Sequence, residues 1–75
     1  MKTIYADFND IDQLGVLTLT AQGSVESINS QEEPLADGEV VLLTDGELWV
    51  TATIRRVGDR YEATGEWKFA DAPPR

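Results

Sequence analysis

The 75-residue chain contains no cysteine and no histidine. Without cysteine, neither a disulfide nor a thiolate-bound metal can stabilise the fold. Without histidine, the commonest metal ligand and the usual general base near neutral pH are also missing. The three serines, at positions 24, 27 and 30, have no histidine to activate them, and there is no glycine-rich phosphate-binding loop. We therefore expect no enzyme activity and no cofactor.

Long hydrophobic runs are also missing. No segment reaches the roughly 20 apolar residues of a membrane span, and Asp7 follows Met1 too closely to leave room for the apolar part of a signal peptide. We expect a cytoplasmic protein without membrane contact. The hydrophobic content of 41% is typical of a folded domain. Residues 1–69 are predicted to form a single β domain, and residues 70–75 a disordered C-terminal tail.

Positive charge is scarce in most of the chain. Six basic and fourteen acidic residues give a net charge of −8. Residues 1–47 hold ten acidic residues and one basic residue, Lys2, which gives −9, whereas residues 48–75 hold five basic and four acidic residues, which gives +1. An acidic surface repels phosphate backbones and attracts basic partners.

The strongest structural signal surrounds Gly58-Asp59, where apolar and polar residues alternate on both sides of a turn dipeptide. A two-residue hairpin loop there places opposite each other residues whose numbers sum to 117. One face of the predicted hairpin is then apolar, with the pairs Ile54–Ala63, Ala52–Gly65, Val50–Trp67 and Leu48–Phe69. The other face carries the favourable pair of Arg55 with Glu62.

A second turn is predicted at Asp45-Gly46, between the run 40–43 and the strand just described. Opposite residues then sum to 91, so that Leu43 faces Leu48 and Val41 faces Val50 on the core side. The opposite face carries a second apolar strip, made of Val40, Leu42 and Trp49.

The N-terminal part repeats the alternation more weakly. It predicts a hairpin between Thr3–Phe8 and Gly15–Ala21, with Ile4 opposite Leu19. Alternation is lost between residues 22 and 38, where Ser24 is predicted to cap one or two helical turns before Pro34.

Five short strands with turn signals between them predict an all-β fold. We expect a five-stranded antiparallel curled sheet or a small SH3-like barrel, with a short helical turn between strands 2 and 3. The alternative is an α+β fold in which the middle segment covers the sheet.

Four oxygen-bearing residues cluster around the first turn, namely Asp7, Asn9, Asp10 and Asp12. Their spacing does not match a calcium-binding loop, because hydrophobic residues occupy ligand positions. Roles in turn formation and solubility are favoured over a metal site, and whether Asp7, Asp10 and Asp12 bind a cation stays open.

Two surfaces are candidates for binding. The strip Val40, Leu42 and Trp49 is either covered by Val25, Ile28 or Leu35, or is a partner-binding patch with Trp49 as its anchor. A second set flanks the Gly58-Asp59 turn and is the alternative patch for single-stranded nucleic acid; it comprises Arg55, Arg56, Arg60 and Tyr61.

Three short motifs, Asp7-Phe8-Asn9, Gly23-Ser24 and Asp45-Gly46-Glu47, resemble those of short uncharacterised bacterial single-domain proteins. The resemblance implies no activity. We therefore expect a non-enzymatic protein–protein interaction or regulatory module, a monomer or weak homodimer, whose partner is a protein with a basic surface. The alternative is a small β-barrel that binds single-stranded RNA, although the acidic charge makes nucleic acid the less favoured partner.

Overall fold

The computed structural model describes residues 1–73 and is mostly β-structure, with one α-helix. Among these residues, no helix has the length and apolar character needed to cross a membrane. In chain order the elements are β1 (Thr3–Tyr5), the 3-10 helix η1 (Phe8–Asp10), β2 (Val16–Thr18), α1 (Gln22–Asn29), β3 (Val40–Thr44), β4 (Trp49–Val57) and β5 (Arg60–Thr64).

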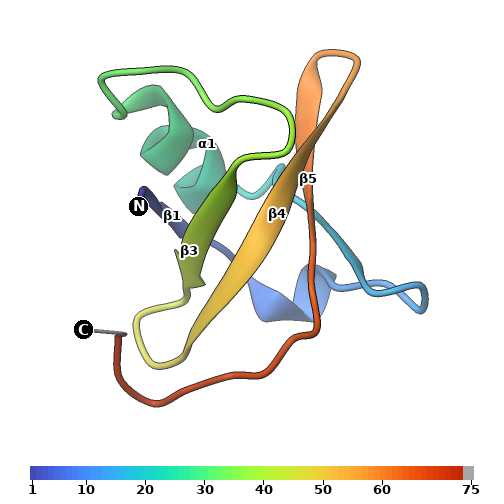
Figure 1. Ribbon diagram of the computed structural model, residues 1–75, viewed down its shortest axis with the longest axis vertical. Coiled ribbons are helices and arrows are strands. Elements are labelled where there is room, and N and C mark those ends of the chain that lie inside the picture. Colours follow the sequence, from blue (N-terminus) through green and yellow to red (C-terminus); the bar gives the residue numbers. More distant parts are fainter. Residues whose placement is uncertain (74–75) are drawn as a thin grey trace.

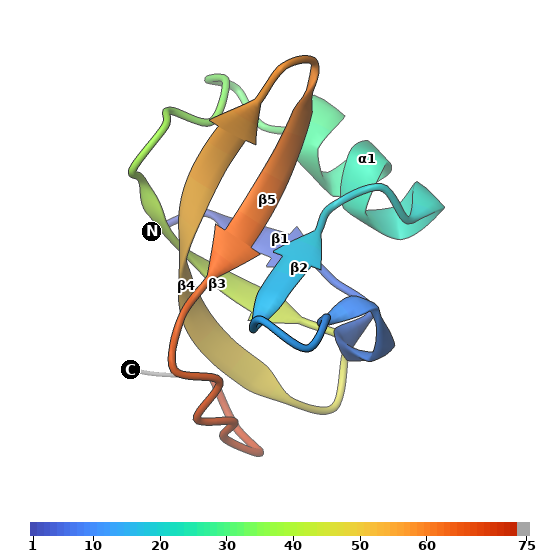
Figure 2. The same cartoon turned by 90° about the vertical axis from the view of Figure 1, so that its right-hand side faces the viewer.

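The five strands form one mixed sheet in the order β1-β3-β4-β5-β2 (Figure 1). β1 runs parallel to β3, whereas all other neighbours are antiparallel, so the antiparallel prediction was wrong for this strand. The N-terminal hairpin was also wrong. Figure 2 shows that η1 lies in the connection from β1 to β2, and β2 is at the opposite edge of the sheet from β1. Because β1 and β2 occupy opposite edges, the sheet is not closed into a barrel.

The register around Gly58-Asp59 is confirmed, since Ile54 pairs with Ala63 and Arg55 with Glu62. The predicted pairing fails farther from the turn, because β5 ends at Thr64 and the next residues bulge away from β4. Ala70 then returns to pair with Trp49 through two backbone hydrogen bonds of 2.8 Å.

Trp67 explains this bulge. Its backbone is left-handed, with φ at 57°, and its indole Nε1 donates a hydrogen bond of 2.8 Å to the carbonyl of Gly15. A regular strand would instead have placed Trp67 opposite Val50. Ala70, the first residue of the predicted disordered tail, therefore pairs with β4; residues 74 and 75 of that tail lie outside the described residues.

The second turn shifts the predicted register by two residues. Leu43 pairs with Val50 and Val41 with Ala52, so that opposite residues sum to 93. The reason is a longer loop, since the Asp45 carboxylate accepts hydrogen bonds of 2.9 Å from the backbone N–H groups of both Glu47 and Leu48. A shift by two preserves which side chains face the core.

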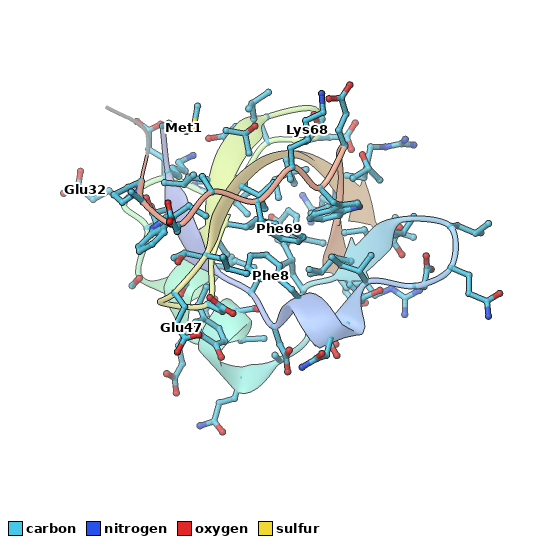
Figure 3. The ribbon with its side chains drawn as sticks, turned by 90° about the horizontal axis from the view of Figure 1, so that it is seen from below. Met1, Phe8, Glu32, Glu47, Lys68 and Phe69 are labelled. Atoms are coloured by element: carbon cyan, nitrogen blue, oxygen red, sulfur yellow. The ribbon has the colours of Figure 1, made fainter. Side chains whose placement is uncertain are left out.

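The core lies on the concave face of the curled sheet and is supplied by every strand. Its buried members are Ile4, Ala6, Leu17, Leu19, Leu35, Val41, Leu43, Val50, Ala52, Ile54 and Ala63. Phe8 and Phe69 close the end next to η1, with ring centroids 4.7 Å apart in an edge-to-face arrangement (Figure 3). Phe8 packs against the core, and Phe69, which is 41% exposed, lies outside it against the Phe8 ring.

Candidate interaction surfaces

Helix α1 attaches to the sheet through polar side chains. Ser24 Oγ donates a hydrogen bond of 2.6 Å to the Tyr5 carbonyl, and Ser27 Oγ accepts one of 3.2 Å from the Tyr5 N–H. Gln31 Nε2 reaches the carbonyl of Thr3 at 3.4 Å. Ser24 and Ser27 lie three residues apart on one face of α1, and Gln31 follows the end of the helix at Asn29. The face satisfies the outer backbone groups of edge strand β1.

Ser24 therefore has a different role from the predicted helix cap. The N-cap is Ala21, which makes no side-chain capping bond, and Ser24 lies inside the helix with 1% of its surface exposed. A hydroxyl buried there needs a partner, and the Tyr5 carbonyl provides it.

Gly23 allows the close approach of α1 to β1. A Cβ atom at this position would lie 2.6 Å from the nearest ring carbon of Tyr5. Real side chains do not tolerate that distance, so only glycine fits without movement of the ring.

Because the polar face of α1 meets β1, the neighbouring apolar residues Val25 and Ile28 border an open groove. Leu19 and Tyr61 form its other wall, and its volume is about 400 Å³. We call this the helix groove. Val25 is 42% exposed, and Ile28 packs partly against the core. Figure 2 shows α1 beside the end of β5 that follows the Gly58-Asp59 turn.

Sequence reasoning missed the helix groove, because Val25 and Ile28 were treated only as covers for the strip on the sheet. The helical spacing of Ser24 and Ser27 was a usable signal, since a helix that docks through a polar face leaves its apolar face elsewhere.

The helix groove carries one charge of each sign at its rim and lies beside an acidic segment of the chain. Asp59 and Arg60 lie at its rim, and the guanidinium of Arg60 is 3.9 Å from the carboxylate of Glu62. The chain segment 20–39, which includes α1, carries no basic residue and five acidic ones: Glu26, Glu32, Glu33, Asp37 and Glu39. The groove thus has an apolar floor in an acidic setting.

The predicted strip on the sheet, Val40, Leu42 and Trp49, is partly covered, but not by the residues expected. Leu42 is 9% exposed and Trp49 is half-buried. The C-terminal segment covers them, since Ala70 and Ala72 line a hollow of about 170 Å³ with both. Val25 lies at the helix groove instead, and Leu35 is part of the core.

Val40 is the exposed member of this strip, with 49% of its surface accessible. It borders a separate shallow hollow of about 280 Å³ whose walls include Thr51, Thr53 and Thr64. The lining also includes Val50, Ala52 and Trp67, so the threonine hydroxyls share this hollow with apolar side chains.

The residues around the Gly58-Asp59 turn divide between two faces of the hairpin. Arg55 lies opposite Glu62 on one face, and Arg56 lies opposite Tyr61 on the other. The Tyr61 hydroxyl donates a hydrogen bond of 3.4 Å to the Leu35 carbonyl. Nucleic-acid binding by Arg55, Arg56, Arg60 and Tyr61 stays a prediction, and these side chains do not form one continuous face.

The acidic residues near the first turn hold backbone groups in place. Asp7 Oδ1 accepts from the N–H of Asn9 at 3.0 Å, and Asp12 Oδ1 accepts from Leu14 and Val16 at 2.8 and 3.0 Å. Within residues 1–73, no three carboxylate, histidine or cysteine side chains are grouped so as to hold a metal ion.

Two carboxylates have a lowered pKa, and both are structural. Hydrogen bonds from the backbone N–H of Ala36 and from Lys2 lower the pKa of Glu39, whose Oε2 lies 3.0 Å from Lys2 Nζ. Hydrogen bonds from the N–H groups of Leu48 and Glu47 lower the pKa of Asp45. Both carboxylates are kept ionised by the turns that they stabilise.

Comparison with known proteins gives no further guide to the site. No family model matches the sequence, and neither a curated protein nor a solved structure matches it. The resemblance to short bacterial single-domain proteins stays a prediction, and the geometry described above is the basis for a functional proposal.

Proposed function

We propose that this protein is a non-enzymatic interaction module that binds a partner protein in the helix groove. The observation behind this proposal is that α1 docks on β1 through Ser24 and Ser27, and that Gln31, just after the helix, adds a third bond. Val25 and Ile28 consequently line an open hollow instead of being fully buried. An accessible apolar groove between a helix and a sheet is a common setting for partner binding.

The helix groove is favoured over the strip on the sheet by its size and its lining. It is the largest of the hollows described above, with Val25 and Ile28 on the helix wall and Leu19 and Tyr61 on the other. In the strip, Val40 is the side chain most accessible to a partner, because the C-terminal segment packs beside Leu42 and Trp49. The non-enzymatic character is supported by the sequence, which has no histidine as a general base and no cysteine as a nucleophile.

Affinity capture from the native cell lysate tests this function with two matched variants. Val25→Gln removes the exposed apolar side chain of the helix groove, and Val40→Gln removes the comparably exposed one of the sheet, without a change of charge in either. We expect a nuclease-resistant partner that the wild type and Val40→Gln retain and that Val25→Gln loses. Retention of the same partner by Val25→Gln, or loss of every captured species after nuclease treatment, would contradict the proposal.

A further inference from the structure

We infer that the segment bound in the helix groove is an amphipathic helix whose apolar face is flanked by lysine or arginine. This inference rests on the proposed function and specifies the chemistry of the partner. It follows from three features of the molecule: the charge around the groove, the state of the sheet edges, and the shape of the apolar lining.

The charge around the groove favours a cationic segment. The five carboxylates of residues 20–39 have one cation in ion-pair contact among the described residues, Lys2 at Glu39. Arg60 at the groove rim lies near Glu62, which offsets its charge. Lysine or arginine residues on either side of an apolar anchor would meet Asp59 at the rim and the acidic segment that contains α1, whereas a second copy of this chain would bring a net charge of −8.

The sheet edges favour a helix over an extended peptide. An extended segment binds by adding a strand to a free edge, because its own backbone groups need partners. Here α1 side chains bond to the outer backbone groups of Tyr5 on β1. At the other edge, both the N–H and the carbonyl of Val16 on β2 are bonded to Asp12. A helix brings its own backbone hydrogen bonds and needs only side-chain contacts.

The lining has the dimensions of a site for one or two large side chains. A volume of about 400 Å³ between Val25, Ile28, Leu19 and Tyr61 is within the range of ligand pockets, roughly 300–1,000 Å³. Apolar residues at i and i+3 or i+4 of a bound helix would enter this space together. The remaining faces of that helix would carry the cationic residues.

Titration with synthetic peptides tests the inference. The probe is a capped helical peptide of about 14 residues with leucine on one face and lysine on the others. One control peptide has glutamate in place of lysine, and the second has glutamine in place of leucine. Binding to the wild type, Val25→Gln and Val40→Gln is followed by calorimetry and by backbone amide NMR shifts, at about 50 and about 500 mM salt.

We expect the leucine–lysine peptide to bind the wild type and to shift the amides of Val25, Ile28 and Tyr61. Val25→Gln should weaken binding about tenfold, because a buried apolar contact is lost, whereas Val40→Gln should change it less than about twofold. High salt should weaken it about tenfold. The leucine–glutamate peptide should not bind, and the glutamine–lysine peptide should bind weakly without dependence on Val25.

Two results would overturn the inference in different ways. The leucine–glutamate peptide could bind as tightly as the leucine–lysine peptide and lose as much affinity in Val25→Gln. That result would refute the cationic partner, and the helix groove would still stand as a docking site. Binding of the leucine–lysine peptide that Val25→Gln leaves unchanged would refute groove docking by such a helix. The capture experiment with the same variants decides the proposed function separately.

Discussion

The two edges of the sheet are protected by different means. At β1, the outer backbone groups are bonded to side chains of α1, which begins 17 residues after β1 ends. At β2, the outer groups of Val16 are bonded to Asp12, only four residues away. An unprotected edge is a site for unwanted strand pairing. One edge thus depends on tertiary packing and the other on a local turn.

This difference has a consequence for function. The helix that protects β1 must present its polar face to the strand, and Val25 and Ile28 then border the helix groove. The turn that protects β2 leaves no comparable apolar surface, since its exposed residue Leu14 stands alone at the loop tip. Protection of an edge by a helix therefore creates a candidate docking site, whereas protection by a turn does not.

The substitution Gly23→Ala should have the largest effect on this comparison. The added Cβ would overlap the Tyr5 ring, and overpacking of this kind costs about 1–3 kcal/mol, whereas alanine gains ~1 kcal/mol over glycine in a helix. We expect a net loss of up to about 2 kcal/mol in urea unfolding. With Tyr5→Ala as background, the same change should become stabilising. Destabilisation in both backgrounds would contradict the overlap.

The β1 edge also explains how far the sequence predicted this fold. The Gly58-Asp59 register follows from alternation across a two-residue turn, and the predicted pairs Ile54–Ala63 and Arg55–Glu62 were correct. The pairing of Ile4 with Leu43 joins residues far apart in a parallel ladder and leaves no turn signal between them. Residues 22–38 were interpreted as a connection because serine and glutamine do not show the apolar periodicity of a docked helix.

The candidate site was harder to predict than the strands, because it too depends on contacts between segments that are distant in the sequence. Tyr61 was recognised as a surface aromatic residue, but its neighbours in the groove, Val25 and Ile28, come from a helix whose orientation depends on Ser24. A hydroxyl that bonds to another segment looks the same in a sequence as one that caps its own helix.

The substitution Ser24→Ala should have the next largest effect. It leaves the Tyr5 carbonyl without its buried partner, which costs about 1–2 kcal/mol of unfolding free energy. Ser30→Ala is the matched control on the same helix, because the Ser30 hydroxyl is exposed and bonds only to the Ser27 carbonyl. We expect the control to change stability by less than ~0.5 kcal/mol. Equal losses of unfolding free energy in the two variants would show that the hydrogen bond from Ser24 to β1 adds no more stability than the local bond of Ser30.

At the β2 edge, Asp12→Ala should cost less, about 0.5–1 kcal/mol, because the N–H groups of Leu14 and Val16 are exposed and water can replace the carboxylate. Amide hydrogen exchange should accelerate locally at Val16, whereas the amide of Tyr5 should keep its protection. Asp12→Asn retains an acceptor oxygen and should behave nearly as the wild type. Faster exchange at Tyr5 in Asp12→Ala would mean that the two edges open together.

Acidification should produce the smallest effect, and it should appear at the β1 edge. The pKa of Glu39 is lowered from its ordinary value of 4.5 by the N–H of Ala36 and by Lys2, the residue that precedes β1. The resulting stability is fully present above pH 4.5 and is lost as the pH falls through the lower pKa of the folded state. The amide of Leu42, which donates to the Lys2 carbonyl, should therefore lose protection in acid, and Glu39→Gln should remove this dependence. If the amide of Val16 lost protection first on acidification, the β2 edge and not the β1 edge would be the acid-sensitive one.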